Sequence, residues 1–148
     1  MRLSTKTRYG LRILLQIALD CECGGARSVK GKTIAEKQDI SEAYLEQIMI
    51  PLKSEGFVKT VRGCQGGYAL NRATEHISVL DLIELFEGPL TLVKCVGGEE
   101  GDCARDAFCP TSGVWKSLSE GIRALAAKVT LKSIVEEAKS KDNPEYVI

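Results

Sequence analysis

The fold is decided by residues 41–70, SEAYLEQIMIPLKSEGFVKTVRGCQGGYAL. Ser41 is a suitable N-cap for a helix that should be kinked or loosened at Pro51 and should end at Gly56. β-prone residues then stand on both sides of a glycine-containing turn at residues 63–67. This pattern predicts a β-hairpin whose loop is longer than two residues. The stretch therefore predicts a helix followed directly by a hairpin.

Two more helices are predicted before this stretch. Ser4 or Thr5 can cap a helix that carries apolar residues at helical spacing and ends near the turn CECGG. Thr33 and Glu36 have the spacing of a capping box for a short second helix, and a tight turn at residues 39–41 follows it. Three helices followed by a hairpin predict a winged helix-turn-helix over residues 1–76.

The remaining residues, 77–148, predict helices on both sides of a loop that contains three cysteines. Ser78 and Asp81 form a capping box for a helix that ends near Phe86, and LKSIVEEAKSK is a short final helix. A long helix begins at Thr111 or Ser112 and repeats apolar residues at gaps of three and four. This is the seam of a helix that packs against another helix. The seam residues are Trp115, Leu118, Ile122, Leu125 and Val129.

Composition favours a cytoplasmic protein with no membrane segment. Arg8 and Arg12 interrupt the apolar N-terminal stretch, and no stretch approaches the length of a transmembrane helix. The chain of 148 residues has a net charge of 0, but twelve basic against seven acidic residues precede position 73, and eight against thirteen follow it. A basic front half is typical of nucleic-acid binding. No catalytic motif is present, and the lone His76 cannot form a triad, so we expect no enzyme.

The predicted fold suggests which residues contact DNA. The second helix of a helix-turn-helix enters the major groove by its N-terminal residues, and basic residues of a wing reach the backbone or the minor groove. Basic residues near the N-terminus can add phosphate contacts. An ordinary helical core with solvated charges remains the alternative. The candidate DNA-binding residues are Ser41, Tyr44, Gln47, Lys59, Arg62, Arg2 and Lys6, with Arg8 as a further phosphate contact.

Cys95, Cys103 and Cys109 lie in the glycine-rich, acidic segment KCVGGEEGDCARDAFCP. Thiolates are soft ligands, and spacings of seven and five intervening residues suit an iron–sulfur cluster better than structural zinc, which favours close pairs. Thiol redox sensing, a labile disulfide and a chance grouping remain open. The other thiols have plainer interpretations: Cys21 and Cys23 as surface residues on a glycine turn, and Cys64 as a tolerated small residue of the wing.

Three stretches together closely resemble the IscR, NsrR and RirA type of bacterial iron–sulfur transcription regulators. They are MRLSTKTRYGLRILLQIAL, ISEAYLEQIMIPLKSEGFVKTVRGCQGGYAL and the cysteine loop with its tryptophan-containing helix. The resemblance extends from Met1 to about Ala138. It implies a mainly α fold with a small β-hairpin wing and a long C-terminal dimerisation helix. It also implies a homodimer in which each winged helix-turn-helix binds one half-site of a palindromic operator in double-stranded DNA.

The resemblance also assigns roles to single residues. It implies a 2Fe-2S or 4Fe-4S iron–sulfur cluster on the three loop cysteines. It also implies that Glu46 makes the choice of DNA sites differ between the protein with its cluster and the protein without it. The chain has Ser112 where IscR-like proteins have a histidine ligand, and Arg8 where NsrR-like members can use an aspartate. The fourth ligand is therefore open: Ser112, Asp102, Asp106, a residue of the other subunit or a small thiol.

The expected function is a dimeric transcriptional repressor that senses iron, iron–sulfur status, oxygen or nitric oxide. In this mechanism, cluster binding organises the cysteine loop against the two neighbouring helices and so sets the separation of the recognition helices. The alternative is a cluster-free repressor of the same fold that responds to thiols or to a partner protein. Family members of that kind act in cysteine metabolism and lack the three-cysteine loop.

Overall fold

The computed structural model describes residues 2–22, 24–96, 103, 105 and 108–141. The predicted class is confirmed: helices dominate, and two strands form one antiparallel sheet. The helices and strands occur along the chain in the order α1 Thr5–Glu22, α2 Gly31–Gln38, α3 Glu42–Ser54, β1 Val58–Val61, β2 Gly67–Leu70, η1 Thr74–His76, α4 Val79–Glu87, α5 Ser112–Lys128 and α6 Leu131–Lys141.

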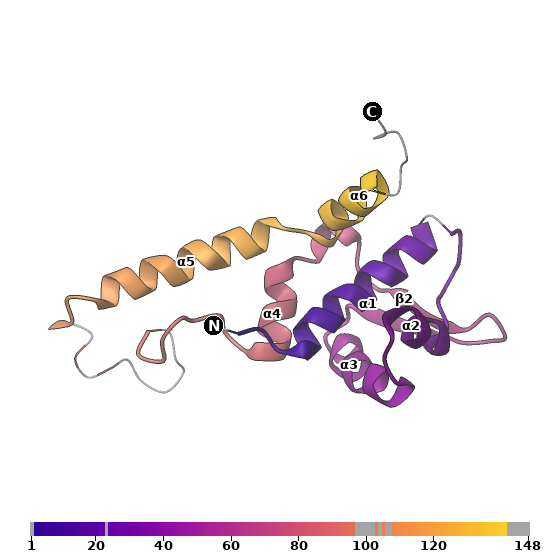
Figure 1. The fold of residues 1–148 in the computed structure, drawn as a ribbon, viewed down its shortest axis with the longest axis horizontal. Helices are drawn as coiled ribbons and strands as arrows, with labels where there is room; N and C mark the ends of the chain where they lie inside the picture. Colours follow the sequence, from indigo (N-terminus) through magenta and orange to yellow (C-terminus); the bar gives the residue numbers. More distant parts are fainter. Residues whose placement is uncertain (1, 23, 97–102, 104, 106–107, 142–148) are drawn as a thin grey trace.

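Helix α1 packs against α2, α3, β2, α4 and α6 (Figure 1). Its apolar stripe, which includes Ile13, Leu14 and Ile17, is fully buried. Leu82 of α4 and Leu131 of α6 belong to the same core cluster. We call this unit, with α1–α4, η1, α6 and the hairpin, the body. The division of the chain at residues 76 and 77 stays a prediction, although the core draws side chains from both parts.

A glycine allows α4 to approach α1 closely. A Cβ atom at Gly10 would lie 2.7 Å from Cε2 of Phe86, which is too close for two carbon atoms. Phe86 therefore packs directly on the backbone of α1. This contact places the end of α4, where the cysteine segment begins, beside the first turns of α1.

The helix-turn-helix forms as predicted at its second helix but not at its first. Asp39 ends α2 in the left-handed conformation with φ 53°, and the Ser41 side chain accepts a hydrogen bond of 3.1 Å from the Tyr44 amide at the start of α3. The predicted capping box of α2 is wrong. Helix α2 already begins at Gly31, its N-cap Lys30 makes no side-chain cap bond, and Thr33 and Glu36 lie inside the helix.

The reason for the early start of α2 is a long-range pairing. The backbone N–H and C=O of Val29 both form hydrogen bonds of 2.8 Å with the backbone of Tyr68 in β2. This pairing fixes the position of the chain just before α2 begins. In the hairpin, β1 and β2 pair Val58 with Leu70 and Val61 with Gly67. A Cβ at Gly67 would lie 2.3 Å from the Val29 carbonyl oxygen, which explains one glycine of the sequence GGY.

Helix α5 runs away from the body, as Figure 1 shows. We call α5 and the described residues between α4 and α5 the arm. Helix α5 packs against α4, where Arg123 forms an ion pair with Glu84, and the Leu92 amide donates to Ser119 Oγ at 3.2 Å. Within the described residues, Ser119 is the one buried residue of α5. The arm therefore has little core of its own.

Backbone hydrogen bonds connect the chain to the body again where α5 ends. The Val79 amide donates to the Val129 carbonyl at 2.9 Å, and the Leu131 amide donates to the Ile77 carbonyl at 2.8 Å. These bonds join the end of α5 to the start of α4, where Ser78 and Asp81 form the predicted capping box. No helix within the described ranges is long and apolar enough to span a membrane.

Candidate functional site

The start of α3 is held against α1 by aromatic side chains. The Tyr44 hydroxyl donates to Thr5 Oγ1 at 3.1 Å, and its ring meets the Tyr9 ring edge-on with centroids 5.8 Å apart. Arg12 lies 5.1 Å from the centre of the Tyr9 ring, and its Nε donates to Gln38 of α2 at 2.8 Å. Tyr44 is therefore half-buried and braced, so the first turn of α3 has a fixed direction relative to α1.

Glu46, the predicted regulatory acid, is not an isolated charge. The Tyr68 hydroxyl donates to Glu46 Oε1 at 2.6 Å, which links α3 to the wing. Burial raises the pKa of Tyr68 to about 12, with the hydrogen bond to Glu46 and its negative charge as the further causes. The sequence could not show this contact because the two residues are on different elements. Gln47 beside it is exposed.

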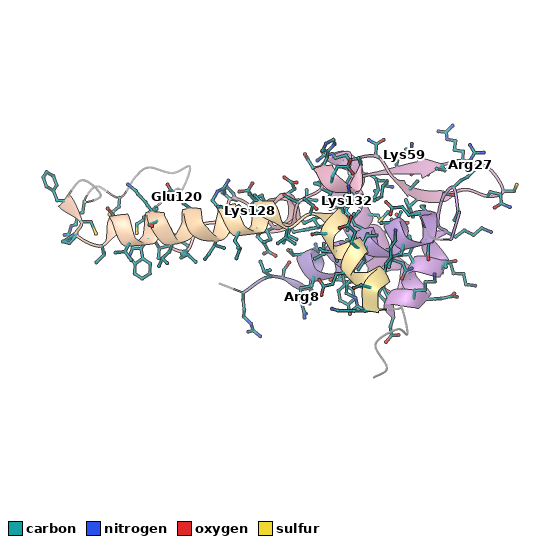
Figure 2. The ribbon with its side chains drawn as sticks, turned by 90° about the horizontal axis from the view of Figure 1, so that it is seen from above. Arg8, Arg27, Lys59, Glu120, Lys128 and Lys132 are labelled. Carbon is teal, nitrogen blue, oxygen red and sulfur yellow. The ribbon has the colours of Figure 1, made fainter. Side chains whose placement is uncertain are left out.

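The predicted basic residues are exposed and come from separate elements. Lys59 lies on β1, and Arg62 follows it in the hairpin loop, whereas Arg2 precedes α1 and Lys6 lies in its first turn. Figure 2 shows Arg27 and Lys59 toward the same end of the molecule, opposite to α5. The loop that carries Arg27 is tied to the wing, because Ser28 Oγ donates to the Gln65 carbonyl at 2.6 Å.

Arg27 was missed by the sequence reasoning. Its only signal was a basic residue in a glycine-containing loop, and that loop lies far along the chain from the wing. DNA contact by the predicted residues stays a prediction.

The three loop cysteines lie in the arm. Cys95 and Cys103 are exposed thiols, and Cys109 is half-buried with its Sγ 3.3 Å from Thr111 Oγ1. Among the residues that the structure describes, no three side chains of His, Cys, Asp or Glu come together as a metal site. Asp102 and Asp106 lie outside the described residues, and Ser112 is the first residue of α5. The donor set itself, thiols within one short segment, fits a metal that prefers soft ligands.

The other cysteines and the histidine differ in their surroundings. Cys21 lies in the last turn of α1 rather than on the glycine turn, because α1 continues to Glu22. Burial raises the pKa of the Cys21 thiol, and the charges of Asp20 and Glu22 add to this effect, which disfavours the thiolate. Cys64 is exposed in the wing loop, and His76 is exposed at the end of η1. Cys23 lies outside the described residues.

The last residue of α4 is hydrogen-bonded to the start of α1, which the sequence did not indicate. The Glu87 carboxylate accepts from the Ser4 amide at 2.8 Å and from the Thr7 hydroxyl. The side-chain hydrogen bonds from Ser4 and Thr7 lower the pKa of Glu87 below its usual value. The chain that leads into the cysteine segment is thus anchored close to Thr5, the partner of Tyr44.

The predicted seam of α5 is uncovered in the single chain. Leu125 is 69% exposed, and Leu118 is 48% exposed. Trp115 and Val129 are also exposed, and Ile122 is half-buried. Large apolar side chains gathered on one helix face mark an interaction surface.

A braced recognition helix beside a basic wing is the architecture of a winged-helix DNA-binding regulator, and the comparisons with known proteins agree. The chain belongs to the Rrf2 family, described as "Iron-dependent Transcriptional regulator", whose model matches residues 3–137. The chain is therefore a transcriptional regulator and not an enzyme, as predicted.

The relatives include both predicted subtypes. The regulator IscR of Klebsiella pneumoniae (strain 342) is 34% identical over 142 residues, which cover 96% of this chain and 84% of the relative. The structure of IscR from T. potens matches with a TM-score of 0.75 and 33% identity, covering 97% of this chain and 92% of that one. CymR, the global cysteine regulator of B. subtilis, matches with a TM-score of 0.73 and 31% identity, covering 93% and 98%.

Proposed function

We propose that this regulator is a cytoplasmic homodimeric repressor that binds a palindromic operator in double-stranded DNA. It senses iron, iron–sulfur status, oxygen or nitric oxide through an iron–sulfur cluster. Cys95, Cys103 and Cys109 hold the cluster, and α3 and the wing bind the DNA. Glu46 adjusts site choice. The DNA-contacting residues are Ser41, Tyr44, Gln47, Lys59, Arg62, Arg2 and Lys6.

The dimer is supported by the apolar seam of α5. Burying a leucine side chain stabilises an interface by about 1.5–3 kcal/mol, so the exposed Leu118 and Leu125 are costly to leave in water. A second copy offers the same seam, and a twofold pairing of identical helices buries both at once. Two winged-helix units then face two half-sites, which matches the symmetry of a palindromic operator.

The cluster is supported by donor chemistry and by the relatives. Exposed thiols in one segment are suited to iron, and the family is described as iron-dependent. A bound cluster would supply a group that is altered by oxygen, by nitric oxide or by iron shortage. Ser112, Asp102, Asp106, a residue of the partner subunit or a small thiol completes the ligand set.

The observation that carries the sensing proposal is how the cysteine segment is anchored. The segment connects α4 with α5, and both ends of α4 are tied to other elements: Glu87 to Ser4 and Thr7 of the α1 start, and Val79 to Val129 after α5. A change in the order of the segment therefore acts on the start of α1, which braces Tyr44, and on the direction of α5. The cluster shifts DNA affinity to the extent that it prefers one of these arrangements.

A cluster-free regulator is the second candidate, and it is supported by the similarity to a cysteine regulator. The structure is nearly as similar to CymR as it is to IscR, with TM-scores of 0.73 and 0.75. In that case the thiols themselves, or a partner protein, carry the signal. The shared fold gives the two candidates the same DNA-binding body, so only the arm distinguishes them.

Protein purified without oxygen separates the two candidates. A cluster gives iron and acid-labile sulfide in the preparation and broad visible absorption, which disappears in the variant with Cys95, Cys103 and Cys109 all changed to Ser. The variant Cys64→Ser is the matched control, because it removes an exposed thiol outside the arm and should keep the absorption. Colourless parent protein without iron or sulfide would favour the cluster-free candidate.

A further inference from the structure

The carboxylate of Glu46 is held by a residue of the wing. Glu46 lies on the exposed side of α3, next to Gln47, and its Oε1 accepts the hydrogen bond of 2.6 Å from the Tyr68 hydroxyl. A glutamate on an exposed helix face ordinarily samples several rotamers. Here one oxygen is fixed, so the orientation of the second oxygen is restricted as well.

Tyr68 is itself held from several sides. Its backbone N–H and C=O both bond to Val29 at 2.8 Å. Its ring packs at the start of α2, where a Cβ at Gly31 would lie 3.2 Å from the ring atom Cε2. The Lys53 ammonium lies 5.6 Å from the ring centroid. The position of the hydroxyl is therefore set by the wing, by α2 and by α3 together.

The chemistry of this pair suits base recognition. A carboxylate in the major groove accepts a hydrogen bond from the N4 amino group of cytosine, but the phosphates repel it unless its charge is partly compensated. Because the pKa of Tyr68 is about 12, the phenol remains a hydrogen-bond donor at neutral pH. The charge of Glu46 is then partly compensated, and its other oxygen is left to face a base.

We propose that Tyr68 is a positioning residue for sequence readout: its hydroxyl holds Glu46 so that α3 selects a cytosine in the base pair that Glu46 faces. This inference rests on the proposed DNA interface of α3 and the wing. It assigns to a wing residue a part in specificity rather than in backbone contact. The plainer role of Tyr68 is a structural tie between the wing and α3, and the experiment must separate the two.

The test is selection from a pool of randomised DNA duplexes by the full-length protein, followed by sequencing of the bound DNA. The parent, Tyr68→Phe, Glu46→Gln and the double variant are compared. Tyr68→Phe should lower the preference for cytosine at one position in each half-site by about tenfold, the size of one good base contact. Base preferences at the other positions should be unchanged. The double variant should lose no more of the cytosine preference than Glu46→Gln alone.

Thr60→Val is the matched control. Thr60 is opposite Tyr68 in the β1–β2 ladder, and the substitution removes a hydroxyl while keeping a β-branched side chain. It should leave every base preference unchanged. Thermal unfolding of each variant shows whether the wing is still folded.

A purely structural tie gives a different result. Affinity in Tyr68→Phe would then fall equally for all duplexes, or not at all, and either result would overturn the inference. If the parent itself selects no sequence, the proposed DNA interface fails with it. If the parent selects an operator and Tyr68→Phe selects the same one equally well, only the role of Tyr68 fails.

Discussion

The body and the arm differ in how much of their apolar surface is covered within one chain. Ile13 and Leu14 of α1 are completely buried, whereas Leu125 of α5 is 69% exposed. The body has the core, the helix caps and the hydrogen-bonded wing of a folded unit. The arm has an uncovered apolar helix face and exposed thiols. The apolar core of the body is covered within one copy, whereas in the proposed function a second copy and a cluster complete the arm.

The largest expected effect is on the arm. The variant Leu125→Glu places a charge at equivalent positions on both α5 helices of the proposed dimer, and like charges across an interface cost several kcal/mol. The affinity between the two subunits and the affinity for the operator should both weaken by about a thousandfold or more, while the circular dichroism spectrum stays helical. Sedimentation and DNA titration measure these effects.

Ala127→Glu is the control for that variant. Ala127 is also exposed on α5, but it lies on the face away from the seam. It should remain a dimer with parental affinity. A dimeric Leu125→Glu protein would show that α5 is not the interface.

A pair of leucine substitutions sharpens the comparison between body and arm. Leu14→Ala opens a cavity in the core and should cost about 2–5 kcal/mol of unfolding free energy. That loss should be independent of protein concentration. Leu118→Ala should lower the unfolding temperature mainly at low concentration, where the dimer dissociates. Thermal melts over a hundredfold concentration range measure both, and identical concentration dependence in the two variants would contradict the distinction.

The junction between body and arm should show a moderate effect. Ser78→Ala removes the capping box of α4 and should cost about 1 kcal/mol. Chemical denaturation measures the loss. Ser133→Ala serves for comparison, because Ser133 Oγ donates to the carbonyl of Thr130, the residue before α6, rather than capping α4. Equal small losses of unfolding free energy in both variants would contradict a specific stabilising role of the α4 cap.

The smallest effect concerns Glu87 and depends on pH. Since hydrogen bonds from Ser4 and Thr7 lower its pKa, Glu87 contributes stability above the usual glutamate pKa, and this contribution is lost as the pH falls through the lowered value. Glu87→Gln should therefore be less stable than the parent at neutral pH, and the difference should shrink in acid. Denaturation at several pH values measures it. A difference that grows in acid would contradict the assigned sign.

Local patterns in the sequence predicted most of the fold. The caps at Ser41 and Ser78, the hairpin and the long helix were all confirmed, because each depends on residues within a few positions of one another. The capping box at Thr33 was wrong because a distant pairing of Val29 with Tyr68 decides where α2 begins. A local pattern cannot show such a contact.

The same limit applies to the candidate site. The sequence identified Glu46 and Tyr44 but not their partners Tyr68 and Thr5, which lie on other elements. It also missed Glu87, whose partners Ser4 and Thr7 are 83 and 80 residues away along the chain. The grouping of the three cysteines was visible in the sequence because they lie within one short segment, but their role as cluster ligands stays a prediction.

The central claim is that a cluster held in the arm changes what the body does on DNA. The most direct measurement is DNA titration of the parent, purified without oxygen, before and after the iron is removed, beside the triple Cys→Ser variant at positions 95, 103 and 109. The account predicts that iron removal changes the affinity or the choice of operator without dissociating the dimer, and that the triple variant behaves like the iron-free parent throughout. Equal affinities of all three preparations at every operator would contradict it.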